Sequence, residues 1–330
     1  MKLNFEQISK ITQGAVEIQE DDGVFSFFRF RKEEANATNK SIARCTAGIE
    51  LNFRTDATAL KLAVDTSCVD TPRSFFAVDV FSDGFFIGCI QNLDDADCVG
   101  DYANKTYPTG SFDGIFSFPD GNKHIRIVLP HSLICKITDI ELIDASFIEP
   151  IKKQKRLLAY GDSITQGYDS LHPSNTYAMR LAESFDAELI NKGIGGECFK
   201  REIAETAKII ETDYITVAYG INDFTVFTQE EFRENCTGFI SVLAEKYKKT
   251  PIFVITPIWS TLRGAKYKFG EISDVDRIIS EVCTPFNNIK VIHGWDLVPH
   301  EEKYFGDLYL HPNDEGFEHY FKNLKKETGI

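Results

Sequence analysis

The sequence lacks any long apolar run. No stretch approaches the roughly 20 consecutive apolar residues that span a bilayer, and the opening residues, MKLNFEQISK, lack the apolar segment of a signal peptide. It also lacks an excess of basic residues, because 50 Asp and Glu outnumber 36 Lys and Arg, a formal net charge of -14. This charge disfavours nucleic acid and anionic membrane surfaces as partners. We therefore expect a cytoplasmic protein that binds neither nucleic acid nor a membrane.

The eight cysteines include no C-x-x-C pair, and no Cys, His and acidic residues have the spacing of metal ligands. In a reducing compartment such cysteines are free, small hydrophobic residues. A G-x-G-x-x-G fingerprint with its ribose-binding acid is missing as well, which disfavours a nucleotide cofactor. We expect no disulfide framework, no metal site and no cofactor.

The chain of 330 residues divides into two parts with different patterns. In residues 1–150, short segments alternate apolar and polar positions between Gly, Asp, Asn and Pro. This pattern is typical of an antiparallel β-sandwich, here of jelly-roll type. Strands are predicted at 25–31, 48–55, 60–66, 74–82, 85–90, 124–130 and 137–145. The sequence FSDG at 81–84 predicts a hairpin turn, and the basic stretch EPIKKQKR at 149–156 is interpreted as the linker.

Residues 151–330 predict strands that alternate with amphipathic helices. Nearly continuous apolar runs, typical of parallel strands covered on both faces, lie at 156–161, 187–191, 213–220, 251–257 and 288–294. Helices are predicted at 175–185, 201–210, 228–249, 273–283 and 311–327. Thr228 and Glu231 form a predicted capping box at the start of one of them. This order predicts an α/β domain with a doubly wound parallel sheet.

Four short blocks lie where reactive groups gather in such sheets, beyond the carboxyl ends of the strands. The first contains Gly161, Asp162 and Ser163. A serine at a strand-to-helix turn is exposed, and helix-start amides nearby can stabilise an oxyanion. Taken alone, Ser163 is read equally well as a helix N-cap. Its hydroxyl is a weak nucleophile, so catalysis would require a base.

The second block runs from Asn191 to Gly196, and its glycines either let backbone amides approach a ligand or serve a loop that needs positive φ. The third contains Asn222 and Asp223. Asn222 is either a neutral donor to an oxyanion or a turn former. In the fourth block, His311 precedes the last helix, and an imidazole suits general-base chemistry near neutral pH.

Together and in this order, the four blocks resemble the SGNH/GDSL hydrolase superfamily over residues 156–328. The resemblance implies a flavodoxin-like hydrolase domain in which Ser163 attacks an ester carbonyl and His311 is its general base. It also implies an oxyanion hole formed by the Ser163 amide, the Gly196 amide and the Asn222 side chain. Gly196 is chosen among the glycines of its block because the family glycine lies five residues after an asparagine.

One departure from the family pattern concerns the triad acid. The family places an aspartate three residues before the histidine, but position 308 is Leu and Asp307 lies four residues before His311. An inserted residue that bulges the loop would still present Asp307 to the imidazole. One alternative is Asp296, at the end of the preceding strand segment. The other is a Ser-His dyad in which Nδ1–H of His311 donates a hydrogen bond to a backbone carbonyl. We expect Asp307.

The order of the two domains resembles the acetyl-xylan esterases of carbohydrate esterase family 2, some of which use a dyad. This resemblance implies O-deacetylation of sugars, with a small-molecule or oligosaccharide ester as the partner, and a carbohydrate-binding or lid-forming sandwich. Asp162 and Trp259 are the candidate substrate contacts. Trp259 follows the fourth strand, where it either stacks on a sugar ring or packs under the loops.

Two further hypotheses stand beside a carbohydrate esterase. One is a lipid, thioester or general short-chain acyl esterase. The other, of a different class, is a catalytically inactive carbohydrate-binding protein, which the intact Ser163, Asn222 and His311 disfavour. The sequence gives no indication of the oligomeric state.

Overall fold

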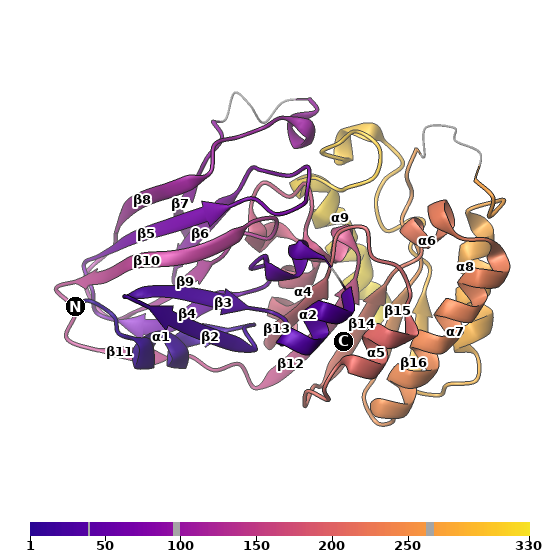
Figure 1. Ribbon diagram of the computed structural model, residues 1–330. Helices are drawn as coiled ribbons and strands as arrows, with labels where there is room; N and C mark the ends of the chain where they lie inside the picture. The colour runs from indigo at the N-terminus through magenta and orange to yellow at the C-terminus, as the bar shows by residue number, and fades with distance from the viewer. Residues whose placement is uncertain (39, 95–99, 262–266) are drawn as a thin grey trace.

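The alternating apolar residues of the first half form two antiparallel sheets that share one apolar core (Figure 1). The computed structural model describes residues 1–38, 40–94, 100–261 and 267–330. One sheet has the order β2-β3-β10-β5-β8, and the other has the order β1-β4-β9-β6-β7 with β11 paired to β4. The strands are β1 (Thr12–Gln13), β2 (Glu17–Asp21), β3 (Val24–Phe28), β4 (Glu50–Thr55), β5 (Ala59–Ser67), β6 (Ala77–Ser82), β7 (Phe85–Gln91), β8 (Gly110–Ser117), β9 (Lys123–Val128), β10 (Ile134–Ile143) and β11 (Ile148–Pro150). The predicted β-sandwich is confirmed.

The hairpin between β6 and β7 was predicted correctly, because Asp83 and Gly84 both adopt positive φ, as a two-residue turn of this kind requires. Strands β2 and β8 were missed, since β2 is a polar edge strand and β8 contains an Asp-Gly pair typical of turns. The linker prediction was too long: β11 takes up residues through Pro150, and the next strand begins at Lys155. Two short helices, α1 (Phe5–Ile11) and α2 (Lys32–Thr38), complete this half.

The second half forms a parallel sheet with the strand order β13-β12-β14-β15-β16, the order of flavodoxin-like folds. Its strands are β12 (Lys155–Gly161), β13 (Ala187–Gly193), β14 (Tyr214–Ala218), β15 (Ile252–Ile255) and β16 (Ile289–Ile292). Two short helices, α3 (Ser163–Gln166) and α6 (Ile221–Val226), follow β12 and β14 directly. The doubly wound α/β prediction is confirmed.

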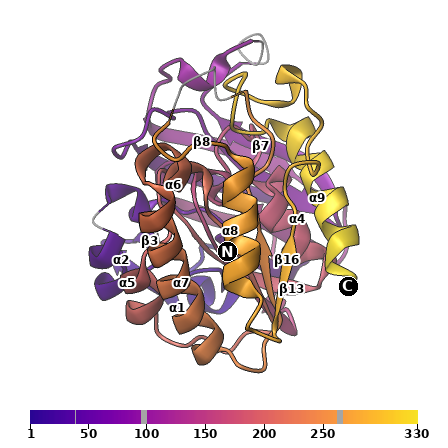
Figure 2. The same ribbon diagram turned by 90° about the vertical axis from the view of Figure 1, so that its right-hand side faces the viewer.

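Helices cover both faces of this sheet (Figure 2). One apolar core lies under α5 (Arg201–Thr206), α7 (Gln229–Lys246) and α8 (Ser273–Cys283), and a second lies under α4 (Tyr177–Ser184) and α9 (Asp314–Thr328). Thr228 and Glu231 form the predicted capping box at the start of α7. Among the described residues, no helix combines the length and the apolar character needed to cross a membrane. The seven described cysteines are free, and Cys98 lies outside the described residues.

Buried polar contacts join the two halves along β13. The guanidinium of Arg29, on the sandwich side, donates to the carbonyl oxygens of Asn191 and Gly193, each at 2.9 Å. Lys192 Nζ lies 2.9 Å from Glu34 Oε2. Because buried charges and carbonyls need such partners, the strand that carries the glycine block is held in place by the N-terminal half.

Candidate active site

The register of the parallel sheet brings three of the predicted blocks to one edge. Gly161, the last residue of β12, pairs with Gly193 on β13 and with Ala218 on β14. Ser163, Gly196 and Asn222 each follow this row within four residues. Side chains far apart in the sequence therefore meet at the carboxyl ends of neighbouring strands.

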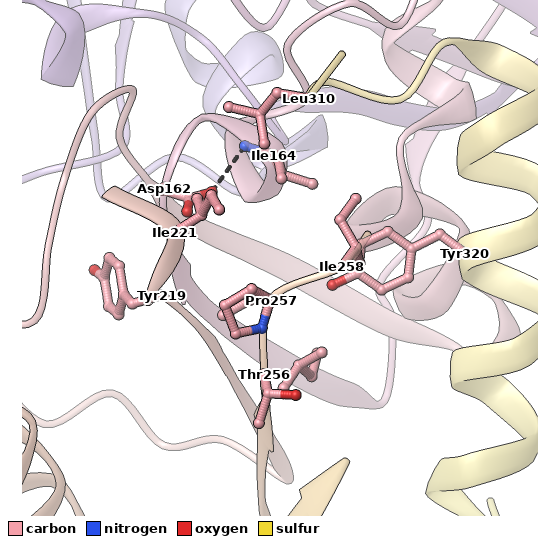
Figure 3. Close-up of a pocket in the computed structure, with 11 residues that line it drawn as sticks. Asp162, Ile164, Tyr219, Ile221, Thr256, Pro257, Ile258, Leu310 and Tyr320 are labelled. Atoms are coloured by element: carbon pink, nitrogen blue, oxygen red, sulfur yellow. Dashed lines mark hydrogen bonds between the residues drawn. The ribbon is translucent and has the colours of Figure 1, made fainter. Parts of the chain in front are cut away.

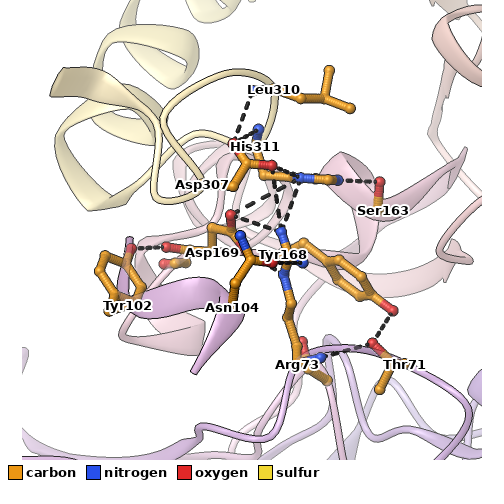
Figure 4. A network of polar contacts seen from close by, with 12 residues as sticks. Thr71, Arg73, Tyr102, Asn104, Ser163, Tyr168, Asp169, Asp307, Leu310 and His311 are labelled. Carbon is orange, nitrogen blue, oxygen red and sulfur yellow. Dashed lines mark hydrogen bonds and ion pairs between the residues drawn. The ribbon is translucent and has the colours of Figure 1, made fainter. Parts of the chain in front are cut away.

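Ser163 is the first residue of α3 and is buried. Its neighbour Asp162 caps the helix by accepting a hydrogen bond from the Ile164 amide at 3.0 Å. The interpretation of Ser163 as the cap is therefore wrong, and its hydroxyl is available for another contact. Ser163 Oγ lies 2.8 Å from Nε2 of His311 (Figure 4).

His311 lies on the loop before α9, where it faces both Ser163 and Asp307. Its Nδ1 atom lies 2.6 Å from Asp307 Oδ2, so the structure has the geometry of a triad and not that of a dyad resting on a carbonyl. Asp296 faces elsewhere, because its carboxylate pairs with His300 at 3.2 Å and is almost fully exposed. Of the two acids considered, only Asp307 reaches the imidazole.

The extra residue between Asp307 and His311 is absorbed by the backbone of Leu308. Leu308 adopts φ +66°, in the left-handed region that side chains other than glycine rarely occupy. The resulting turn directs the backbone amides of residues 309, 310 and 311 at Asp307 Oδ1, at 3.0, 2.8 and 3.1 Å. The departure from the family spacing thus leaves the carboxylate facing the imidazole.

The surroundings of Asp307 keep it ionised. Burial opposes its charge, but the hydrogen bond and the charge interaction with His311, together with the amides of residues 309 and 310, lower its pKa to about 2. A carboxylate in this state accepts the Nδ1 proton of the imidazole, so Nε2 is left as the acceptor facing Ser163.

The predicted oxyanion donors lie just beyond the carboxyl ends of the three neighbouring strands β12, β13 and β14. Gly196 is exposed and adopts φ +68°, whereas Gly193 and Gly195 are buried and donate their amides to the side chains of Asn191 and Gln166. The structure therefore favours Gly196 within its block.

Asn222, in the first turn of α6, extends over this glycine loop. Its Nδ2 atom donates to the carbonyl oxygen of Glu197 at 3.0 Å, which leaves the second amide hydrogen for a ligand. As the first residue of α3, Ser163 also has an amide without an intrahelical acceptor.

Residues 159–319 match the GDSL-like Lipase/Acylhydrolase family. The C-terminal half of the chain is thus similar to this family. This match, together with the geometry around Ser163, supports acyl-ester hydrolysis as the class of activity. No curated protein matched the chain.

Solved structures resemble the whole chain, the sandwich and the GDSL-like domain together. The salicylyl-acyltransferase SsfX3 from a tetracycline biosynthetic pathway is 20% identical with a TM-score of 0.77, over 96% of this chain and 93% of that one. A protein described as a GDSL-like lipase from Bacteroides ovatus is 18% identical with a TM-score of 0.77, over 98% of this chain and 97% of that one. A family two carbohydrate esterase from Cellvibrio japonicus is 15% identical with a TM-score of 0.61, over 98% of this chain and 97% of that one. At these identities the likeness establishes the shared fold.

A small, mostly apolar pocket is lined by residues adjacent in sequence to Ser163 and His311 (Figure 3). Its walls include Ile164, next to Ser163, and Leu310, next to His311. Most of its other lining residues come from the ends of β14 and β15: Ala218, Tyr219, Ile221, Ile255, Thr256, Pro257 and Ile258. The free space is about 20 Å³, little more than one water molecule occupies.

The two candidate substrate contacts have other roles in the structure. Asp162 is buried and caps α3. Trp259 lies against His300, with ring centroids 5.3 Å apart and planes 9° apart, and against Phe305. One face of the indole is thus covered, and the structure favours packing over sugar stacking.

Arg73 and Asp169 are the site residues that the sequence did not indicate. Arg73 lies in the sandwich half, between β5 and β6, and its guanidinium reaches Asp169, Asp307 and His311 in the GDSL-like domain (Figure 4). Its sequence surroundings, Thr-Pro-Arg, carry no motif. Only the burial of a charged side chain marks it, and burial is not visible in the sequence.

Asp162 gives the site a pH-dependent effect on stability. Burial raises its pKa from an ordinary 3.8 to about 6, so the folded protein retains a proton that the unfolded chain releases. Stability therefore falls as the pH rises from about 4 to 6 and stays lowered above that. Asp162→Asn keeps a capping oxygen without this cost. We expect it to stabilise the fold at pH 7 by up to about 3 kcal/mol, and hardly at all at pH 4.

Urea unfolding from pH 4 to 8 measures this difference. Asp56→Asn is the matched control, because Asp56 is only partly buried and its hydrogen bonds from Ser146 lower its pKa. That variant should gain no stability at high pH. A gain for Asp162→Asn that is equal at pH 4 and pH 7 would contradict the assignment.

Proposed function

We propose that the protein is a serine esterase that removes short acyl groups, O-acetyl above all, from carbohydrates. The observation that carries the proposal is the chain of contacts from Ser163 through His311 to Asp307. Ser163 Oγ lies 2.8 Å from Nε2 of the imidazole, and Asp307 Oδ2 lies 2.6 Å from Nδ1. A hydroxyl, a base and the acid that orients the base are thus within hydrogen-bonding reach of one another.

In the first half of the reaction, Ser163 Oγ attacks the ester carbonyl while His311 Nε2 takes the hydroxyl proton. The carbonyl oxygen becomes an oxyanion, which would accept hydrogen bonds from the amides of Ser163 and Gly196 and from Asn222. When the carbon–oxygen bond to the alcohol breaks, His311 gives its proton to the departing alkoxide. Ser163 is left acylated.

In the second half, His311 removes a proton from a water molecule, whose oxygen attacks the acyl carbon. The same donors stabilise the second oxyanion. His311 then protonates Ser163 Oγ as the acyl group leaves as a carboxylic acid. Asp307 stays ionised throughout and stabilises the imidazolium that forms in each half.

The carbohydrate part of the proposal is supported by the arrangement of both halves. Structures described as family two carbohydrate esterases share the sandwich and the parallel sheet with this chain, over 98% of its length in the Cellvibrio japonicus enzyme. An acetyl xylan esterase from the rumen bacterium Butyrivibrio proteoclasticus has the same fold, with a TM-score of 0.56 and 14% identity over 86% of the chain.

Two substitutions test the mechanism in an assay of p-nitrophenyl acetate hydrolysis. Ser163→Ala removes the nucleophile, and we expect kcat to fall by roughly 10⁴-fold or more. Asn222→Ala removes one oxyanion donor, and we expect a loss of roughly 10²–10³-fold. Ser184→Ala is the control, because that hydroxyl only contacts the backbone of α4. Hydrolysis by Ser163→Ala at the wild-type rate would refute the mechanism, and an inactive wild-type protein would favour the binding-protein alternative.

The pocket lined by Ile164, the residue after Ser163, supports a short acyl group. About 20 Å³ of free space between Ile164, Ile258 and Leu310 accommodates a methyl group, while longer chains would need the walls to move. We place the acetyl methyl group here. This assignment separates the proposal from a lipid or long-chain thioester hydrolase.

An acyl-length series of p-nitrophenyl esters tests this placement. We expect kcat/KM to fall roughly tenfold from acetate to butyrate, and Ile258→Ala to raise the butyrate-to-acetate ratio several-fold because it enlarges the pocket. Ile278→Ala removes an equally buried side chain from the opposite core and should leave the ratio unchanged. A wild-type preference for octanoate would contradict a short-acyl pocket.

A further inference from the structure

The N-terminal sandwich inserts one side chain among the reactive groups of the GDSL-like domain. Arg73 forms a two-pronged ion pair with Asp169, with Nε–Oδ1 at 2.7 Å and Nη2–Oδ2 at 3.0 Å. The same Nη2 atom lies 3.4 Å from Asp307 Oδ2 and 3.2 Å from His311 Nδ1. All four residues are buried. A guanidinium from one half of the chain therefore lies against the acid and the base of the other half (Figure 4).

Further contacts fix the position of Arg73. The ring of Tyr168 lies under its guanidinium at 5.5 Å and also flanks the His311 imidazole at 5.6 Å. Asn104 Oδ1 accepts from Nη1 at 3.3 Å. Asp169 itself adopts φ +69°, and its carbonyl oxygen accepts a hydrogen bond from the Tyr102 hydroxyl. These contacts hold the ion pair between Arg73 and Asp169 in one geometry.

Two carboxylates lie near Nδ1 of His311, and only one of them lies within hydrogen-bonding distance. Asp307 Oδ2 lies 2.6 Å from this atom, and Asp169 Oδ2 lies 3.9 Å away. The guanidinium of Arg73 carries only donors, so it cannot accept the proton. It engages both oxygens of Asp169 instead, which leaves Asp307 as the acceptor that orients the imidazole.

The charge of Arg73 also balances the surroundings of His311. The charged groups that face the imidazole are Asp307, Asp169 and Arg73, and Asp162 interacts with it from beyond Ser163. Without the guanidinium, two buried carboxylates beside Nδ1 would strongly favour the imidazolium form. An imidazolium cannot accept the proton of Ser163, so the base would be lost at neutral pH.

We propose that Arg73 and Asp169 are positioning residues for this reaction: the sandwich supplies a cation that keeps Asp307 on Nδ1 and keeps the imidazole in its basic form. This inference rests on the proposed esterase function. It makes the sandwich a part of the reaction machinery, because the GDSL-like domain alone would present His311 to two unbalanced carboxylates.

The pH dependence of kcat/KM for p-nitrophenyl acetate tests the pair. We expect Arg73→Met to lower kcat roughly 10–100-fold at pH 7 with little change in KM. We also expect it to shift the acidic limb of the profile to higher pH, by about one pH unit or more. Asp169→Asn removes one of the carboxylates, so the acidic limb of its profile should shift to lower pH instead. In the double variant the charges balance again, and we expect its profile to return toward that of the wild type. Arg73→Lys keeps the charge and should keep the limb near its wild-type position.

Arg126→Met is the matched control. Arg126 is buried, and it joins Glu50 of the sandwich to Glu183 of α4 at 2.8 and 2.7 Å, away from the catalytic groups. This variant should lose thermal stability while its pH profile stays unchanged. Profiles of Arg73→Met and Asp169→Asn that coincide with the wild type, with only a lower Tm, would overturn the inference. Ser163→Ala separates the two proposals: if that variant stays active, the esterase mechanism fails, whatever Arg73 does.

Discussion

The hydrogen bond between the Ser163 hydroxyl and the His311 imidazole joins residues 148 positions apart, and the other features of the site depend on it. It forms because β12 ends level with its neighbours and turns at once into α3, while the loop before α9 folds back over the same edge. Both side chains are buried. In such a position water screens the electrostatic interactions less, so the orientation of each donor and acceptor has a larger effect than it would have at the surface.

Much of this arrangement could be predicted from the sequence. Apolar runs broken at regular intervals predicted the fold of both halves. Because reactive groups gather at the carboxyl ends of parallel strands, Ser163, Asn222 and the glycine block were expected to lie together. The triad acid was harder, because the position of Asp307 depends on the left-handed backbone of Leu308, a conformation that a leucine does not suggest. Arg73 lies 96 positions from Asp169 and 238 from His311. No local pattern indicates a contact that exists only after two separate sheets have packed together.

Cationic side chains of the sandwich make several contacts across the interface between the two halves. Arg29 fixes the carbonyls of β13, Lys40 donates to the Gly195 carbonyl at 3.1 Å, and Arg73 reaches the triad. Charges removed from water are costly unless they are paired, so these contacts specify one relative position of the two halves. The glycine loop and the His311 loop are each held by a cation from the sandwich. The proposed oxyanion hole and the proposed base therefore share a dependence on the N-terminal half.

The central claim is that Ser163 is activated by His311. Covalent labelling tests it most directly: the protein is treated with an alkyl fluorophosphonate, which reacts with activated serine hydroxyls, and the adduct is located by peptide mass mapping. The account predicts one adduct, on Ser163, that forms at least roughly a hundredfold more slowly in His311→Ala. An adduct on another residue, or equal labelling rates with and without the imidazole, would contradict it.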